Sequence, residues 1–330
     1  MTTPAALPTY ATSSAWLQYQ AFFPAGLRCA ADAPPEEHYW RWRGLDVHLD
    51  RVALPTSPLK LIVLHGAGAY GRVMAPVAVL AQRYGYETVA PDLPGYGLTA
   101  VPRRQMTYDL WIDCVCDLVE VELARDDRPV ALFGVSLGGL LAYQVAARLA
   151  VRSPASAARV VGLIATTLVD TREPAVRRDF ARTPMLGRVG LWLLDRLAPL
   201  LDGLPLPMAL MSKMDRISNL PALSELVQRD RLGGGAWVPA RFLRTLMTTA
   251  PAIEPEHFTA CPVLLAHPGV DRMTDIAHSR RFFDRLAAPK RMVVLEGASH
   301  MPTEHPGVDQ FEAAVVEFLR QVLPRTTIFN

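Results

Sequence analysis

The sequence predicts an α/β fold in which a mostly parallel sheet carries helices on both faces. Two observations lead to this prediction. Short, continuous apolar runs such as residues 61–64 are typical of strands that are covered on both faces. These runs alternate along the chain with longer stretches of helical periodicity. Strands separated by helices form βαβ units, which place the strands parallel in one sheet.

The elements follow one another in a regular order. Residues 38–43 and 45–49 alternate in strand fashion on either side of Gly44, which predicts an antiparallel hairpin. Further apolar runs predict strands at 61–64, 88–90, 130–133, 160–165, 263–266 and 292–295. Helical periodicity predicts helices at 73–84, 108–125, 137–151, 276–286 and 308–322, and the apolar residues of the second of these fall on one stripe.

The strand pattern disappears between residues 168 and 255. This segment is rich in leucine, and prolines divide it into short helical pieces. We therefore expect a helical cap at 168–255, inserted after one strand of the sheet. The core domain then comprises 31–167 and 256–330, and a leader of residues 1–30 precedes it.

Composition excludes several classes of protein. Half of the 330 residues are hydrophobic and the net charge is +2 with both signs dispersed, so no nucleic-acid surface is indicated. The four cysteines show neither metal-ligand spacing nor a disulfide framework, which favours a reducing compartment. The first residues do not resemble a secretory signal, and no uncharged apolar run reaches the ~18 residues of a transmembrane helix. We expect a cytoplasmic protein and leave its oligomeric state open.

A serine lies between glycines where a strand is expected to turn into a helix. Gly134, Ser136 and Gly138 form a G-x-S-x-G pattern, in which the glycines leave room for a sharp turn that exposes the serine hydroxyl. The pattern also fits a simple glycine-rich turn. Its position between strand and helix favours a nucleophile at Ser136.

A serine hydroxyl needs a base and an orienting acid. His300 follows the last predicted strand and is the favoured base, with His267 and His305 as competitors. Asp271 follows the preceding strand and is the favoured acid, with Asp170 as its rival.

Two backbone amides are expected to stabilise an oxyanion. Leu137 begins the helix after Ser136, so its amide is free of a helical partner. Ala67 lies in the glycine-rich turn after residues 61–64 and is the expected second donor. This turn taken alone is a weak signal.

Five motifs in this order resemble the α/β-hydrolase family: HGAG at 65–68, DLPGYGLT at 92–99, GVSLGG at 134–139, PGVD at 268–271 and GASH at 297–300. The resemblance covers residues 38–166 and 256–323. It implies the α/β-hydrolase fold, with an eight-stranded sheet whose second strand is antiparallel and with a lid over the site. HGAG together with the serine elbow is similar to the branch of monoacylglycerol lipases, lysophospholipases and carboxylesterases.

This resemblance implies a serine esterase that needs no metal or organic cofactor and acts on a small-molecule or lipid-like ester. Thioester or lactone cleavage and acyl transfer use the same residues, whereas cofactor-free oxygenase chemistry and a non-catalytic binding role are less favoured. Seven apolar cap residues suggest either an acyl pocket or ordinary packing: Trp192, Leu193, Leu197, Leu201, Met208, Met211 and Met214. The same apolar cap also allows contact with a membrane surface.

Overall fold

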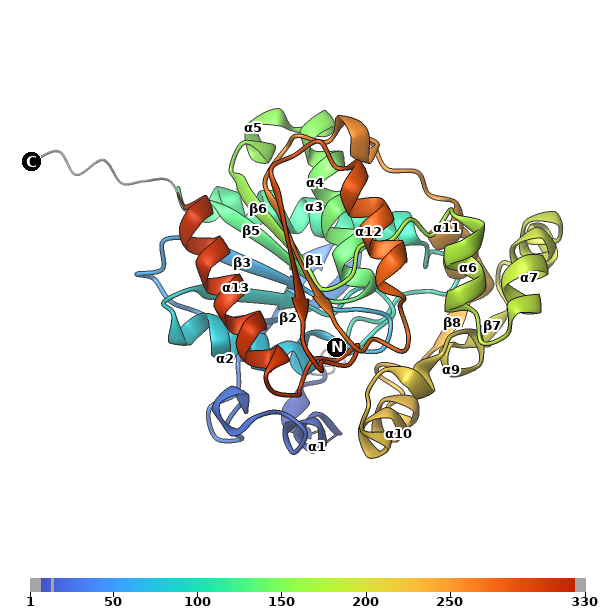
Figure 1. Ribbon diagram of the computed structural model, residues 1–330, viewed down its shortest axis with the longest axis horizontal. Coiled ribbons are helices and arrows are strands. Elements are labelled where there is room, and N and C mark those ends of the chain that lie inside the picture. The colour runs from blue at the N-terminus through green and yellow to red at the C-terminus, as the bar shows by residue number, and fades with distance from the viewer. Residues whose placement is uncertain (1–6, 13–14, 324–330) are drawn as a thin grey trace, which may run out of the picture.

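The computed structural model, which describes residues 7–12 and 15–323, confirms the predicted fold (Figure 1). Eight strands form one sheet in the order β1-β2-β4-β3-β5-β6-β9-β10. Their bounds are β1 Glu36–Trp42, β2 Leu45–Val52, β3 Lys60–Leu64, β4 Glu87–Pro91, β5 Val130–Gly134, β6 Val160–Ala165, β9 Val263–Pro268 and β10 Lys290–Leu295. Strand β2 is antiparallel to β1 and β4, and the other neighbouring strands are parallel. The reversed second strand was expected from the family resemblance.

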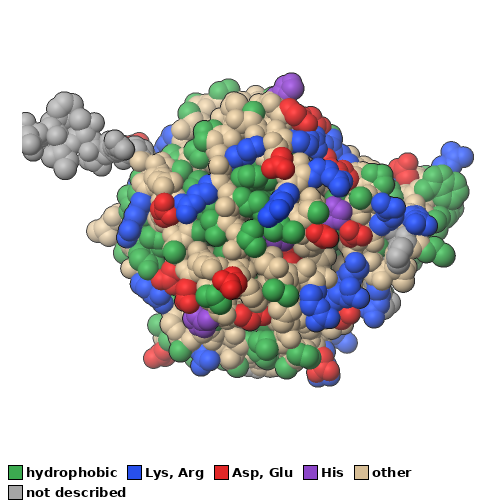
Figure 2. Space-filling model, viewed as in Figure 1, with side chains coloured by type: hydrophobic (Ala, Val, Ile, Leu, Met, Phe, Trp, Pro, Cys, Tyr) green, Lys and Arg blue, Asp and Glu red, His purple; other side chains and the backbone are tan. Residues whose placement is uncertain are grey.

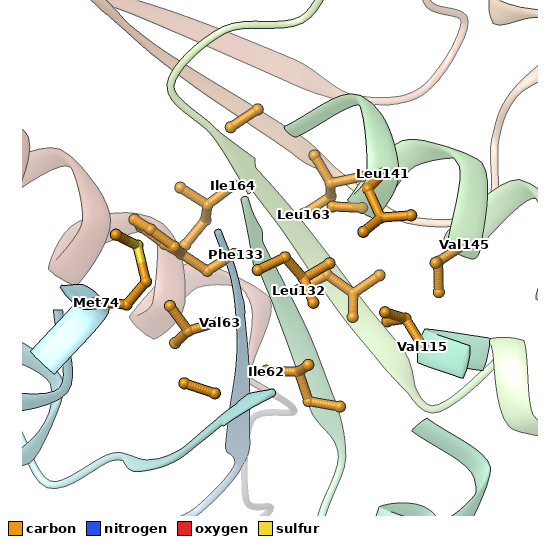
Figure 3. Packing of buried hydrophobic residues seen from close by; sticks show 14 of the residues in the cluster. Ile62, Val63, Met74, Val115, Leu132, Phe133, Leu141, Val145, Leu163 and Ile164 are labelled. Carbon is orange, nitrogen blue, oxygen red and sulfur yellow. The ribbon is translucent and has the colours of Figure 1, made fainter. Parts of the chain in front are cut away.

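Helices cover both faces of the sheet. Alternate residues of β5 point to opposite faces, so Phe133 packs on Phe311 of α13 with ring centroids 5.8 Å apart. Leu132 points instead toward residues of α3 and α4 (Figure 3). The larger core helices are α2 Ala75–Arg83, α3 Tyr108–Arg125, α4 Leu137–Arg152, α12 Ile276–Arg285 and α13 Gly307–Val322, and the short ones are η3 Gly71–Met74, α5 Pro154–Ala157 and η5 Pro255–His257. Strands β3, β4, β5 and β9 are buried along their whole length.

The segment between β6 and β9 forms a separate group of helices at one end of the sheet (Figure 1). It consists of α6 Pro174–Phe180, α7 Pro184–Arg196, α8 Ala198–Leu201, α9 Met208–Met211, η4 Met214–Arg216, α10 Pro221–Arg229 and α11 Ala240–Thr248. Several of its prolines occupy the first turn of a helix, where no amide hydrogen bond is lost. We call residues 168–255 the insert.

The expectation that the insert lacks strands was wrong. Two three-residue strands, β7 Pro205–Pro207 and β8 Trp237–Pro239, pair antiparallel within it. Strands this short, with proline at their ends, show no alternation of polarity that sequence analysis can detect.

The residues before β1 pack tightly onto the rest of the chain. They form η1 Tyr10–Thr12, α1 Ala15–Gln20 and η2 Ala25–Leu27. Trp16 and Tyr19 are buried in the hydrophobic core. The Tyr10 hydroxyl donates to Asp92 Oδ2 at 2.6 Å, and the Tyr19 hydroxyl donates to Asp230 Oδ2 of the insert at 3.0 Å. This segment therefore makes hydrogen bonds with both the core and the insert.

The helices and the cysteines bear on two of the expectations drawn from composition. Within the described ranges, none of the helices combines the length and the apolar character that crossing a bilayer requires. The four cysteines are buried free thiols.

Candidate active site

Ser136 sits in a strained turn between β5 and α4. Its φ of 55° and ψ of −124° lie outside the regions that a serine normally adopts, at a cost of roughly 1–3 kcal/mol. The flanking glycines make this turn possible. A Cβ at Gly134 would lie 2.0 Å from the Gly138 carbonyl oxygen, and one at Gly138 would lie 2.2 Å from that of Leu64. Gly139 is equally constrained, since its Cβ would lie 2.3 Å from the Thr167 oxygen.

The structure brings Ser136, His300 and Asp271 together in one hydrogen-bonded chain. His300 Nε2 lies 2.7 Å from Ser136 Oγ, and His300 Nδ1 lies 2.7 Å from Asp271 Oδ2. Each side chain comes from a loop or turn after a parallel strand: β5, β9 or β10. An ionised carboxylate only accepts hydrogen bonds, so Nδ1 donates to Asp271, and in the neutral imidazole Nε2 is then the atom that can accept the serine hydroxyl hydrogen.

The surroundings keep the Asp271 carboxyl ionised. Burial raises its pKa, but His300 and two backbone amides outweigh this and hold the pKa below its ordinary value. The amides of Met273 and Thr274 both donate to Asp271 Oδ1 at 2.8 Å. The side chains of Asp271 and His300 are almost completely buried, which strengthens the interaction between them.

The rival acid and bases lie in other settings. Asp170 lies in the insert, shortly after β6, and accepts hydrogen bonds from the Arg172 guanidinium group. His267 is buried with its Nδ1 2.8 Å from the Pro268 oxygen. His305 is exposed and pairs with Asp309 at 2.6 Å. In the described chain, no hydrogen bond joins any of the three to Ser136.

The two expected oxyanion donors flank Ser136. Leu137 is the first residue of α4, and the turn that holds Ala67 contacts the elbow directly, since a Cβ on Gly66 would lie 2.9 Å from Ser136 Cβ. Both residues line the same cavity as Ser136 and His300. Across the described residues, neither amide has a hydrogen-bond acceptor.

His65 braces this turn. Its Nε2 accepts from the Leu93 amide at 3.0 Å, so Nδ1 carries the proton and donates to the Gly66 oxygen at 2.8 Å. The imidazole is fully buried, and burial lowers its pKa to about 4. His65 is therefore a neutral structural residue.

Thr166 was not among the predicted site residues. Its Oγ1 accepts the Ser136 amide hydrogen at 2.9 Å and thereby fixes the strained residue from the neighbouring strand. The only sequence signal was a polar residue directly after the strand at 160–165, which is too common to single out.

A mostly apolar cavity lies between the elbow and the insert. Its lining includes Ser136, His300, Ala67 and Leu137 from the core, and side chains of α6, α7, α9 and α11 from the insert. Of the seven apolar residues proposed for it, Met208, Met211 and Met214 line the cavity. Trp192, Leu193, Leu197 and Leu201 do not line it, so the acyl-pocket alternative does not hold for these four. Helix α7 directs Leu191 and Leu194 inward, so that Trp192 is left 61% exposed.

One group of side chains has the composition of a metal site. Oxygen and nitrogen atoms of Glu37, His48 and Asp50 lie within 4.8 Å of one another. Arg72, however, donates two hydrogen bonds to Asp50, at 2.6 and 2.8 Å, and places its own positive charge there. This arrangement is a buried ion-pair network and does not suit a cation.

Comparisons with known proteins agree with this fold. The model of the alpha/beta hydrolase family matches residues 61–313. No curated protein matches the chain in sequence. A monoacylglycerol lipase from Paleococcus ferrophilus superposes with a TM-score of 0.67 at 22% identity, over 84% of this chain and 99% of the lipase.

Two other solved structures share the fold. A soluble variant of the Saccharomyces cerevisiae monoglyceride lipase, bound to a substrate analogue, gives a TM-score of 0.70 at 15% identity, over 92% of this chain and 99% of its own. Est1E of Butyrivibrio proteoclasticus, bound to ferulic acid, gives a TM-score of 0.59 at 18% identity, over 86% of this chain and 98% of Est1E. With more than half of its length matched by the family model and with this sheet topology, the chain belongs to the alpha/beta hydrolase family.

Proposed function

We propose that the protein is a serine hydrolase that cleaves carboxylic esters, with Ser136 as nucleophile, His300 as general base and Asp271 as orienting acid. The observation that carries this proposal is the chain of two 2.7 Å contacts from Ser136 Oγ through His300 to Asp271, at the wall of an apolar cavity. A neutral imidazole with its Nε2 lone pair on the hydroxyl is the arrangement that acyl transfer requires.

The first half of the reaction forms an acyl-enzyme. Ser136 Oγ attacks the ester carbonyl carbon while its proton passes to His300 Nε2, and the imidazolium that forms is stabilised by Asp271. The amides of Ala67 and Leu137 stabilise the negative carbonyl oxygen of the tetrahedral intermediate. The imidazolium then protonates the leaving alcohol as the carbon–oxygen bond breaks.

The second half releases the acid. His300 takes a proton from a water molecule that attacks the acyl carbon, and it returns this proton to Ser136 Oγ as the acyl–serine bond breaks. The same two amides hold the oxyanion again. No step requires a metal or an organic cofactor.

The insert (168–255) serves in this proposal as a cap over the core domain (31–167 and 256–330), and it sets the substrate class. Methionines 208, 211 and 214 supply flexible apolar surface for an acyl chain. Known lipases share the fold, and two of the similar structures were solved with a substrate analogue or ferulic acid bound. We infer a small-molecule or lipid-like ester with an apolar acyl group as the substrate.

A serine-directed fluorophosphonate probe with peptide mapping tests the proposal. We expect labelling of Ser136, hydrolysis of 4-nitrophenyl esters across an acyl chain series, and at least about a 10⁴-fold loss of kcat in Ser136→Ala. Product analysis in the presence of an added alcohol separates hydrolysis from acyl transfer. An unlabelled Ser136 together with an absence of activity on every ester would refute the proposal, and so would activity that persists in Ser136→Ala.

A further inference from the structure

A second hollow lies on the outside of the insert and adjoins the active-site cavity. We call it the outer groove. Side chains of α6 and α7 line it, among them Arg177, Arg178, Arg188, Leu191, Trp192 and Asp195. Arg177 and Leu191 line both the outer groove and the cavity that contains Ser136. The two hollows are therefore neighbours that share a wall.

The outer groove carries positive charge without carboxylate partners. Among the residues that the structure describes, none of Arg177, Arg178 and Arg188 forms an ion pair, and the side chains of Arg178 and Arg188 make no hydrogen bond. Arg177 donates through Nη2 to the Arg172 carbonyl oxygen. With Asp195 as the acidic residue of this lining, three arginines and one aspartate leave a net charge of +2. Figure 2 shows basic side chains gathered over this end of the molecule.

Other arginines of the same insert are neutralised within the protein. Arg241 and Arg244 both bind Asp202, at 3.2 and 2.7 Å. Arg172 binds Asp170 and Glu254, each at 2.7 Å. Among the described residues, the guanidinium groups of the outer groove have no such carboxylate partner and are open to a ligand.

Arg177 stands out against the cavity that it lines. It is half-buried, and within the described chain it is the sole arginine, lysine, aspartate or glutamate of a lining dominated by valine, leucine and methionine. Placing a cation against apolar surface without a counter-charge is unfavourable, and a bound anion removes this cost. Guanidinium groups bind carboxylates and phosphates through paired hydrogen bonds.

We propose that the substrate is an amphiphile with an anionic end group, a carboxylate or a phosphate, which binds Arg177, Arg178 and Arg188 while the ester carbonyl lies at Ser136. This proposal rests on the proposed ester hydrolysis and names its substrate class. Thr166 contacts Ser136, and the Arg172 carbonyl contacts Arg177. The six residues of chain from 166 to 172 span at most about 21 Å. One long-chain amphiphile can thus reach both sites.

Matched pairs of substrates test the proposal. One pair consists of 4-nitrophenyl esters of straight-chain acids of equal length, with and without a free terminal carboxylate. The other pair consists of a lysophosphatidate and a monoacylglycerol with the same acyl chain. For wild type we expect a higher kcat/KM on the anionic member of at least one pair, and the pair that responds identifies the source of the anion.

Removal of the cations should weaken this preference. In the double variant Arg178→Ala/Arg188→Ala, the ratio of kcat/KM for the anionic over the neutral substrate should fall about tenfold, mainly through KM, and Arg177→Ala should lower it further. Added salt should weaken the preference of wild type. The control is Arg229→Ala in α10, which removes an exposed arginine paired with Glu225 and lining neither hollow. It should keep the wild-type ratio.

A binding measurement separates this inference from the proposed function. Calorimetry of Ser136→Ala with dodecyl phosphate requires no turnover, and its Kd should rise about tenfold when Arg178 and Arg188 are also replaced. An unchanged Kd, or a substrate ratio equal in wild type and the double variant, overturns the inference while ester hydrolysis stands. Arginine-dependent binding without hydrolysis of any ester would instead refute the proposed function and retain the anion site.

Discussion

Replacing Asp271 with asparagine should trap His300 in the wrong tautomer. The amides of Met273 and Thr274 both donate to Asp271 Oδ1, so only the oxygen of an asparagine side chain can occupy that place. The NH₂ group then replaces Oδ2 and faces His300 Nδ1 at 2.7 Å. Because that group only donates, Nδ1 must accept, and the imidazole proton moves to Nε2. Nε2 can then no longer take the proton of Ser136.

Because His300 can no longer act as a base in this variant, the expected loss in kcat is large. A serine hydrolase with the inactive tautomer loses about 10⁴ in kcat, which corresponds to about 5.5 kcal/mol of transition-state stabilisation. The exchange of one oxygen for one nitrogen leaves the shape of the site intact. We therefore expect KM and the thermal midpoint to change little compared with kcat.

Steady-state kinetics on a 4-nitrophenyl ester measure this effect, with Asp170→Asn as the matched control. Asp170 contacts Arg172 rather than His300, so its replacement should reduce kcat less than about tenfold in folded protein. A fully active Asp271→Asn variant would refute the reasoning. A 10⁴-fold loss in Asp170→Asn instead would transfer the role of the acid to that residue.

Three further measurements test the surroundings of the site. Gly134→Ala places a Cβ 2.0 Å from the Gly138 oxygen, so urea unfolding should show a loss of about 1–3 kcal/mol or more, and an unchanged midpoint would contradict the tight elbow. Thr166→Val removes the acceptor of the Ser136 amide and should cost about 1–3 kcal/mol of unfolding free energy and slow acylation, measured by denaturation and by the fluorophosphonate labelling rate; equal labelling rates would count against this role. The pKa of His65 is about 4 in the folded chain and about 6.5 when unfolded, so its contribution to stability is complete above about pH 6.5 and is lost as the pH falls toward 4. Between pH 8 and pH 5 wild type should therefore lose about 2 kcal/mol more than His65→Asn, and equal losses would show that His65 does not titrate in this way.

The strands and helices that were predicted correctly are those whose residues show a local pattern of apolar side chains. Buried parallel strands need continuous apolar residues, so the strands and the helices between them were located to within a few residues. Ser136, Asp271 and His300 were candidates because each follows such a strand, and the carboxyl ends of parallel strands meet at one edge of a sheet. Their assignment as a catalytic triad remains a proposal that the kinetics above address.

The features that escaped prediction depend on contacts between distant parts of the chain. Gly139 is required because the Thr167 oxygen approaches it, and Thr166 matters because it binds the Ser136 amide. Neither partner is visible from the local pattern. In the insert, the orientation of α7 decides that Leu191 faces the cavity while Trp192 faces outward. A segment that is apolar on several faces gives no periodicity from which to infer this choice.

The hydrogen bond between Tyr19 and Asp230 has a consequence for folding during synthesis on the ribosome. The two residues are 211 positions apart, and at 5–20 residues per second the later one is made roughly 10–40 s after the earlier one. During that interval the Tyr19 hydroxyl lacks the acceptor that the insert supplies. Tyr19 is thus translated well before the residue that accepts its hydroxyl hydrogen, and this contact between the segment before β1 and the insert can form only after residue 230 has been made.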